Sequence, residues 1–150
     1  MANTLEITDA DLFAIGAQTI VNTVNCVGVM GKGVALRFRQ AYPEMYRDYV
    51  GRCHRGEVRP GVPYLYLDRS GTRVINFPTK YHWRNGSELS WIDDGLAGIA
   101  DHVREWGITS LALPPPGCGN GGLDWRQVRP IVEARLGHIG IPVYVCIPRR

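Results

Sequence analysis

Residues 19–33, TIVNTVNCVGVMGKG, join a predicted strand to a glycine-rich loop and decide the class of fold. Residues 19–24 are β-branched and mostly apolar, which is typical of a buried strand. The loop leads into residues 34–41, which are predicted to form a helix. In an open α/β sheet, ligands bind beyond the carboxyl ends of the strands. The loop is therefore a candidate binding site.

The central part of the chain continues the pattern. Pro43 suits a first helical turn, so a helix is expected from residue 43 to about residue 55. Residues 64–67 and 73–77 flank a DRSG turn and predict a β-hairpin. Apolar residues at helical spacing predict an amphipathic helix over residues 91–106. Ser90 and Asp93 resemble a capping box at its start.

A second strand, loop and helix follow near the C-terminus. Residues 110–113 predict a short buried strand that runs into the loop PPPGCGNGG. Asp124 can cap a helix to Leu136, which Pro130 should kink or delay. Residues 143–147 predict the last strand. Strands that alternate with helices indicate an α/β layered fold with a mixed sheet.

Length and composition indicate one soluble domain over residues 1–150. The chain is 45% hydrophobic and 21% charged, as in ordinary globular proteins. It has no run of about 18 apolar residues and no secretory signal, so no membrane association is expected. Its four cysteines show no metal-site spacing and are interpreted as reduced thiols of a cytoplasmic protein. No metal site is therefore expected.

Positive charge is concentrated in one part of the chain. Residues 31–84 carry eleven Lys or Arg and only four acids, a net +7, against −4 for the remainder. Such asymmetry indicates a polyanionic partner, with phosphates as the first candidate, although an ordinary solvated surface is the alternative.

Two glycine-rich loops, residues 28–33 and 117–122, each follow a predicted strand and precede a helix. Free backbone N–H groups at such a loop can bind an anion. Neither loop has the Walker motif or the dinucleotide fingerprint, and either can be a simple tight turn. Together with Lys80, where the stretch VINFPTKYHWR (residues 74–84) leaves the sheet, they favour a pocket for a diphosphate-linked sugar.

Five motifs carry a resemblance to a known family: DLF (11–13), IVNTVN (20–25), GKGVA (31–35), NFPTKYHWR (76–84) and PGCGNGGL (116–123). Together they resemble the macrodomains of DarG antitoxins, which remove the ADP-ribose that DarT toxins attach to thymidine in single-stranded DNA. The resemblance covers essentially the whole chain. It implies an α/β/α sandwich with a mixed sheet, ADP-ribose as ligand, and no cofactor. It also implies that these residues can be one domain of a longer antitoxin with a DarT-type partner.

The resemblance also implies a set of ligand contacts. Asp11 is expected to meet the adenine amino group, and Asn22 or Asn25 the distal ribose. The loop at 117–122 is expected to hold the diphosphate through its N–H groups. The implied ligand-binding set is Asp11, Leu12, Asn22, Asn25, Gly31, Lys32, Gly33, Val34, Thr79, Gly117, Cys118, Gly119, Asn120, Gly121 and Gly122.

Lys80 matches the lysine that the family branch uses in catalysis. Its neighbours Tyr81, His82, Trp83 and Arg84 are expected to lower its pKa by desolvation and positive charge, so that the amine can attack the distal ribose. It can instead stabilise the leaving thymine electrostatically, or simply reach solvent. His82 is a candidate proton shuttle or a stacking residue.

Two further expectations concern the loop acid and the DNA. A human terminal-ADP-ribose relative has an Asp where this chain has Gly121, so a Lys/Asp pair does not carry over. Tyr81 and Trp83 are expected to stack on DNA bases, and Arg84 to hold a phosphate. The rival functions are removal of ADP-ribose from protein carboxylates and binding of ADP-ribose without turnover.

Overall fold

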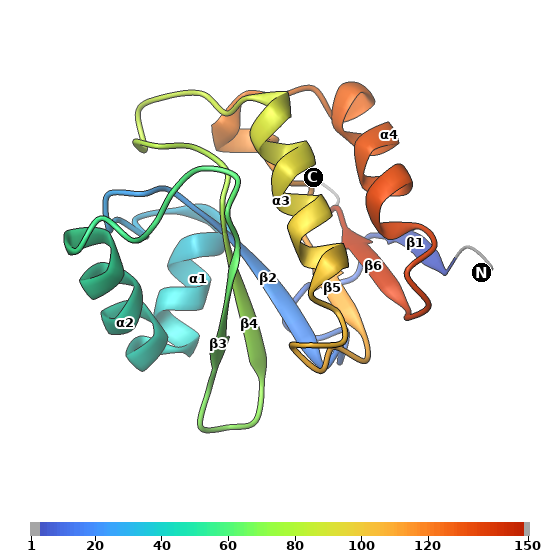
Figure 1. The fold of residues 1–150 in the computed structure, drawn as a ribbon, viewed down its shortest axis with the longest axis horizontal. Coiled ribbons are helices and arrows are strands. Elements are labelled where there is room, and N and C mark those ends of the chain that lie inside the picture. The colour runs from blue at the N-terminus through green and yellow to red at the C-terminus, as the bar shows by residue number, and fades with distance from the viewer. Residues whose placement is uncertain (1–3, 149–150) are drawn as a thin grey trace.

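The computed structural model describes residues 4–148 and arranges them as a six-stranded sheet between helices (Figure 1). The strands are β1 Leu5–Thr8, β2 Thr19–Val24, β3 Tyr64–Leu67, β4 Arg73–Pro78, β5 Leu111–Leu113 and β6 Val143–Cys146. The helices are α1 Gly33–Ala41, α2 Pro43–His54, α3 Leu89–Asp101 and α4 Trp125–Leu136, with a short 3-10 turn over Gly119–Gly121. Within these residues, no helix is long and apolar enough to cross a membrane.

The sheet is mixed and has the order β1-β6-β5-β2-β4-β3. All neighbouring strands are parallel except β3 and β4, which form the predicted antiparallel hairpin. Asp68 accepts hydrogen bonds from the backbone N–H and the hydroxyl of Ser70 in the hairpin turn. The expected mixed sheet is confirmed.

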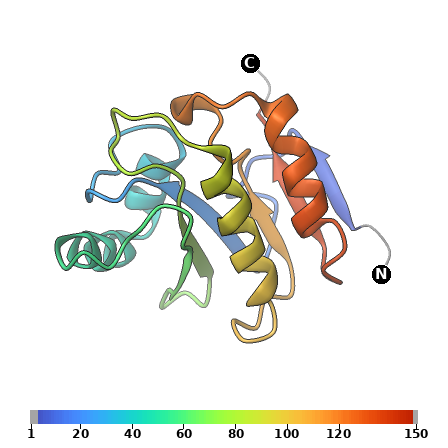
Figure 2. The ribbon, with the colours of Figure 1, turned by 45° about the horizontal axis from the view of Figure 1, so that its top comes forward.

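Each face of the sheet has its own apolar core because strand side chains alternate between faces. On one face, Val21, Ile75 and Phe77 pack with residues of α3 and α4, which lie side by side in Figure 2. On the other face, Ile20 and Val74 pack with residues of α1 and α2. The α/β/α architecture is therefore confirmed.

Three local predictions need correction. The helix predicted over residues 91–106 ends at Asp101, and residues 102–107 form turns. That helix begins at Leu89 with Glu88 at the N-cap and no side-chain cap, so the capping box at Ser90 is wrong. Strand β1 was not predicted because its four residues lie at the edge of the sheet, where only partial burial weakens the apolar pattern.

The final helix begins where its cap predicts. The carboxylate of Asp124 accepts a hydrogen bond from the N–H of Arg126 over 2.9 Å, and α4 starts at Trp125. Pro130 lies inside α4 and does not delay its start. Its ring is exposed, so water can satisfy the carbonyl that the proline cannot pair.

The topology brings three loops together. Strands β2, β4 and β5 are parallel, so their carboxyl ends lie at one edge of the sheet. The segments that leave there are residues 25–32, 79–88 and 114–124, and the first and third lead into helices α1 and α4. The parallel strands therefore bring Lys80 and the two glycine-rich loops to the same edge of the sheet.

Candidate functional site

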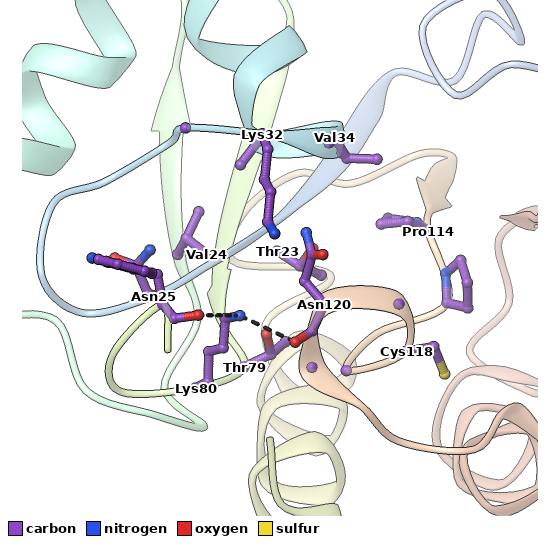
Figure 3. Close-up of a pocket in the computed structure, with 18 of the residues that line it drawn as sticks. Thr23, Val24, Asn25, Lys32, Val34, Thr79, Lys80, Pro114, Cys118 and Asn120 are labelled. Carbon is purple, nitrogen blue, oxygen red and sulfur yellow. Dashed lines mark hydrogen bonds between the residues drawn. The ribbon is translucent and has the colours of Figure 1, made fainter. Parts of the chain in front are cut away.

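A cavity of about 630 Å³ opens at this edge of the sheet (Figure 3). Its volume lies within the roughly 300–1,000 Å³ range of sites for small organic ligands. The residues that line it are Thr23, Val24, Asn25, Val29, Gly31, Lys32, Gly33, Val34, Ala35, Thr79, Lys80, Trp83, Pro114, Pro115, Gly117, Cys118, Gly119, Asn120, Gly121, Cys146 and Pro148.

Most of the residues predicted to form the site line this cavity. The structure brings together Asn25, Gly31, Lys32, Gly33, Val34, Thr79, Lys80, Trp83, Gly117, Cys118, Gly119, Asn120 and Gly121. It does not bring to the lining Asp11, Leu12, Asn22, Tyr81, His82, Arg84 and Gly122. Sequence reasoning missed several apolar lining residues, including Val29, Pro114 and Pro148. These side chains carry no chemical signature, and only their positions at strand ends and loop flanks could have indicated them.

Lys80 connects two walls of the cavity. Its Nζ donates hydrogen bonds to the carbonyl oxygen of Trp83 over 3.1 Å and to that of Asn120 over 3.3 Å (Figure 3). Partial burial lowers the pKa of Lys80, and the positive charge of Lys32 lowers it further. The sequence predicted that residues 81–84 would supply both effects, but the positive charge comes from Lys32, which lies on the glycine-rich loop before α1.

The chain uses lysine only in this cavity. Of its 17 basic residues, Lys32 and Lys80 are the two lysines, and all others are arginines. Arginine stays protonated, whereas a lysine pKa shifts when the amine is desolvated. No Asp or Glu is found among the lining residues of the described chain. The cavity is therefore positively charged, and its cations are lysines, which can lose their proton, and not arginines, which do not.

Backbone groups of both glycine-rich loops suit an anion. Within residues 4–148, no side chain caps the N-terminus of α1, where Gly33 and Val34 line the cavity. Free N–H groups at a helix N-terminus bind phosphates well. In the other loop, Gly117 has φ +76°, and a Cβ there would lie 2.7 Å from Cδ1 of Leu123. Only glycine permits this close approach.

Asn25 lines the cavity, but its side chain is mostly used by its own loop. Its Nδ2 donates to the carbonyl of Val29 over 2.7 Å. Its Oδ1 accepts from the N–H groups of Val27 and Val29 and from the hydroxyl of Tyr49. One amide hydrogen remains for a ligand. Asn25 therefore shapes the loop and has little capacity to bind ribose hydroxyls.

Asn22 does not reach the cavity. It is fully buried on the α1/α2 side of the sheet, where its Nδ2 donates to Oδ1 of Asn76 over 3.1 Å and contacts the sulfur of Met30. The resemblance to macrodomains implied that Asn22 or Asn25 would bind the ribose hydroxyls. Strand alternation instead directs Asn22 into the core.

Asp11 is held by an ion pair at the protein surface. Both of its carboxylate oxygens accept from the guanidinium of Arg37, over 2.6 and 3.0 Å, and this hydrogen bonding lowers the pKa of Asp11. The guanidinium also lies 4.4 Å above the ring of Phe13. Leu12 is buried in the core of the α1/α2 face. The carboxylate keeps lone pairs for an amino group but lies outside the cavity lining.

The loop after Lys80 presents flat side chains at the cavity mouth. Tyr81 and Trp83 are 58% and 45% exposed, which is unusual for large aromatic residues. The guanidinium of Arg84 lies 4.7 Å from the ring centre of Trp83, and the His82 ring lies 5.0 Å away on a tilted plane. His82 Nδ1 accepts from the N–H of Arg84. His82 thus packs at an angle against the Trp83 ring and lies outside the cavity lining.

In the second glycine-rich loop, Cys118 is a poor nucleophile and Gly121 has little room for a side chain. Burial raises the pKa of the Cys118 thiol, which disfavours the thiolate that a nucleophile needs. A Cβ on Gly121 would lie 3.1 Å from Cβ of Ser87.

Within the described residues, no group of three or more His, Cys, Asp or Glu side chains could hold a metal ion.

Residues 21–132 match the sequence model of the macro domain. The chain belongs to the macro domain family. As a solved structure, the macrodomain of Mycobacterium tuberculosis DarG is 41% identical, with a TM-score of 0.92 and coverage of 99% of this chain and 100% of that one. This macrodomain is also similar to Thermosipho africanus DarTG in complex with ADP-ribose, at 38% identity and a TM-score of 0.92, over 98% of this chain and 43% of that one. The resemblance to DarG macrodomains is therefore confirmed.

Among curated proteins, a relative from Mycobacterium tuberculosis named "DNA ADP-ribosyl glycohydrolase" is 51% identical over 122 residues. The match covers 79% of this macrodomain and 34% of the relative. A relative of the same name from Thermus aquaticus is 42% identical over 143 residues, covering 92% of this macrodomain and 39% of the relative. This macrodomain therefore spans well under half the length of the relatives it matches.

Proposed function

We propose that this macrodomain is a hydrolase that removes ADP-ribose from thymine bases of single-stranded DNA. The observation that carries the proposal is the position of Lys80, whose amine projects into the cavity and bonds carbonyl groups of two of its walls. The names of the similar proteins agree with this chemistry. We further propose that the domain acts as an antitoxin against a DarT-type DNA ADP-ribosyltransferase in the cytoplasm, and that the described residues form a single domain.

The ligand is ADP-ribose, and the reaction needs no cofactor. The N–H groups at the start of α1 and in the loop at 117–122 bind the diphosphate, with Lys32 adding positive charge. Asn25, Gly31, Val34 and Thr79 surround the distal ribose. Asp11 accepts a hydrogen bond from the adenine amino group. Leu12 is buried in the core and anchors the segment that carries Asp11. Asn22 is buried in the core beneath the site and does not contact the ligand.

Lys80 supplies the catalytic amine. In a covalent route, the bond from the anomeric carbon to the ring oxygen of the distal ribose breaks and the oxygen takes up a proton, while neutral Lys80 bonds to that carbon and gives up a proton. The bond from the carbon to the thymine nitrogen then breaks, the thymine takes up a proton, and an imine to Lys80 remains. Water adds to the imine carbon, the amine leaves, and the sugar ring closes to give ADP-ribose. In an electrostatic route, the ammonium of Lys80 stabilises the negative charge of the leaving thymine while water attacks directly. Partial burial and the charge of Lys32 favour the neutral amine.

The DNA strand passes over the loop that follows Lys80. Exposed Tyr81 and Trp83 provide faces on which bases stack, and Arg84 can hold a backbone phosphate. His82 extends the stack beside Trp83 and does not shuttle protons to the cavity. Because the platform is open, a single strand with unstacked bases suits it better than a duplex does.

A release assay tests this function. A single-stranded oligonucleotide carrying ADP-ribose on thymine is incubated with the protein, and free ADP-ribose and unmodified DNA are measured. Release from DNA, but not from a protein modified on carboxylates, supports the proposal. Release from the protein substrate alone would establish the rival glycohydrolase. Tight ADP-ribose binding without release from either substrate would establish a binding module.

A further inference from the structure

Lys32 occupies an unfavourable position for a cation. It is the N-cap residue of α1, with φ −159° and ψ 169°, and its side chain makes no capping hydrogen bond. The N-terminus of a helix carries a partial positive charge, so Ser, Thr, Asp or Asn is favoured there and a lysine is not. Such a departure from helix-capping rules, when it lines a functional cavity, indicates a residue retained for function.

Lys32 and Lys80 face the same space from opposite walls of the cavity. Figure 3 shows the Lys32 side chain extending from the start of α1, with the amine of Lys80 directed toward the same region from the end of β4. Asn120 lies between the two walls: its carbonyl accepts from Lys80 Nζ, and its Nδ2 would lie 3.6 Å from a Cβ on Gly33. The second glycine-rich loop, residues 117–122, thus contacts Lys80 directly and lies next to the start of α1, where Lys32 is found.

No described carboxylate balances these charges. The titratable side chains that line the cavity are the two lysines and the thiols of Cys118 and Cys146. Around Lys80, the segment after β4 contributes the Trp83 carbonyl and the glycine-rich loop contributes the Asn120 carbonyl. Arg84 lies over the Trp83 ring at the mouth, and Asp124 is paired with Arg126. Lys32 is therefore the charged group that acts on the Lys80 amine.

We propose that Lys32 is a positioning residue that acts through Lys80: its charge at the start of α1 lowers the pH at which the Lys80 amine loses its proton. The inference rests on the proposed role of Lys80, but it can be measured without any enzymatic activity. It also fits the use of lysine at position 80 in a chain whose basic residues are otherwise almost all arginines, because Lys80 must be able to lose its proton. At position 32 the proposal requires only a positive charge.

The titration of Lys80 tests the proposal directly. Protein labelled with ¹³C-lysine gives two side-chain signals because the chain has two lysines. In Lys32→Arg and in Lys32→Gln, the single remaining signal is that of Lys80. The midpoint for Lys80 should stay near the wild-type value in Lys32→Arg, which keeps the charge, and shift upward in Lys32→Gln. The exposed Arg104→Gln, at the opposite edge of the sheet, removes the same charge and should leave the midpoint unchanged. Equal midpoints in Lys32→Arg and Lys32→Gln would overturn the proposal.

Salt and activity provide two further arms. Lys32 is exposed, so added salt should screen its charge and raise the Lys80 midpoint in wild type but not in Lys32→Gln. A salt response of equal size in both proteins would contradict the assignment. In the release assay, Lys32→Gln should lose rate at neutral pH and recover it as the pH rises, whereas the pH midpoint of Lys32→Arg should match that of the wild type whatever its overall rate. If the wild type shows no release but the Lys80 midpoints shift as expected, the proposed function fails while the charge coupling stands.

A stability measurement separates this role from a structural one. Lys32→Ser places a good N-cap side chain at the start of α1 and should raise the melting temperature of the ligand-free protein by about 2–4 °C. A lower melting temperature would show that Lys32 stabilises the fold and would contradict its retention for function.

Discussion

Asn22 Nδ2 donates a hydrogen bond to Asn76 Oδ1 over 3.1 Å, at the same register on strands β2 and β4. Both residues are fully buried. Asn76 also donates to the hydroxyl of Tyr64 and contacts the sulfur of Met45. Among the described residues, the Oδ1 of Asn22 is a buried side-chain atom without a partner. The pair thus forms a polar link inside an apolar core, beneath the strand ends that carry the cavity.

This pair predicts an unequal response to two matched substitutions. Asn76→Ala leaves both polar atoms of the Asn22 amide without a side-chain oxygen or nitrogen partner and removes the donor to the Tyr64 hydroxyl. Asn22→Ala removes the unpartnered oxygen but leaves Oδ1 of Asn76 without its donor. We expect each to lower the free energy of unfolding by about 1–3 kcal/mol, with Asn76→Ala the more damaging. Urea denaturation measures both. In Asn22→Ala, ADP-ribose affinity per folded molecule should not change, and a tenfold loss at unchanged stability would show that Asn22 is a ligand residue after all.

Lys80 variants separate the two catalytic routes. Lys80→Met keeps the aliphatic stem and should lower the release rate by about 10²–10⁴-fold, with ADP-ribose affinity largely retained. Lys80→Arg keeps a charge that cannot be deprotonated. If the neutral amine attacks, Lys80→Arg should be as inactive as Lys80→Met, and borohydride should trap a wild-type adduct visible by mass spectrometry. Substantial release by Lys80→Arg, with no trapped adduct, would favour the electrostatic route.

The lowered pKa of Lys80 predicts how activity depends on pH. If the neutral amine reacts, the rate should rise with pH and level off above a midpoint that lies below 10.5, the ordinary lysine value. The same shift affects stability with a definite sign. The unfolded chain binds more protons between the folded midpoint and 10.5, so the contribution of Lys80 to stability should increase with pH across that window. A rate that falls with pH through the window would contradict the neutral amine.

Two glycines of α3 predict opposite effects of one substitution. A Cβ on Gly95 would lie 2.1 Å from Cε1 of buried Phe77, whereas a Cβ on Gly98 would meet Cγ of Pro63 at an ordinary 3.4 Å. Gly95→Ala should therefore destabilise the protein by about 1–3 kcal/mol or more through overpacking. Gly98→Ala should stabilise it by up to about 1 kcal/mol through helix propensity. Thermal unfolding of the two variants compares them, and equal effects would show that α3 does not pack on β4 as described.

Position 121 has little room for a side chain, because a Cβ there would lie 3.1 Å from Cβ of Ser87. The N–H of Ser87 donates to the carbonyl of Gly121 over 2.9 Å, and the Ser87 hydroxyl donates to the carbonyl of Thr79. A side chain at position 121 would press on Ser87 and displace the end of β4 next to Lys80. We therefore expect Gly121→Asp to lower release and ADP-ribose affinity, with Gly121→Ala separating the steric part from the charge. Faster release by Gly121→Asp would show that the loops accommodate an acid.

The fold could be read from the sequence where local pattern and burial agree. The apolar run of β2, the turn between β3 and β4 and the cap at Asp124 each depend on neighbouring residues, so each was predicted correctly. The end of α3 was not, because apolar spacing continues to Val103 after the helical hydrogen bonds stop at residue 101. The partly buried edge strand β1 carries too little apolar alternation to be recognised.

What the sequence by itself determined was the presence of a lysine after a buried strand and of two glycine-rich loops, because chain chemistry and glycine conformation are local properties. Only the tertiary structure decided which groups face that lysine. The parallel pairing of β2, β4 and β5 places Lys32 and Asn120 around Lys80, although they lie 48 and 40 positions away in the chain. Likewise, because side chains of a strand alternate between the faces of the sheet, Asn22 points into the core. Electrostatic coupling depends on distance through space, which spacing along the chain does not specify.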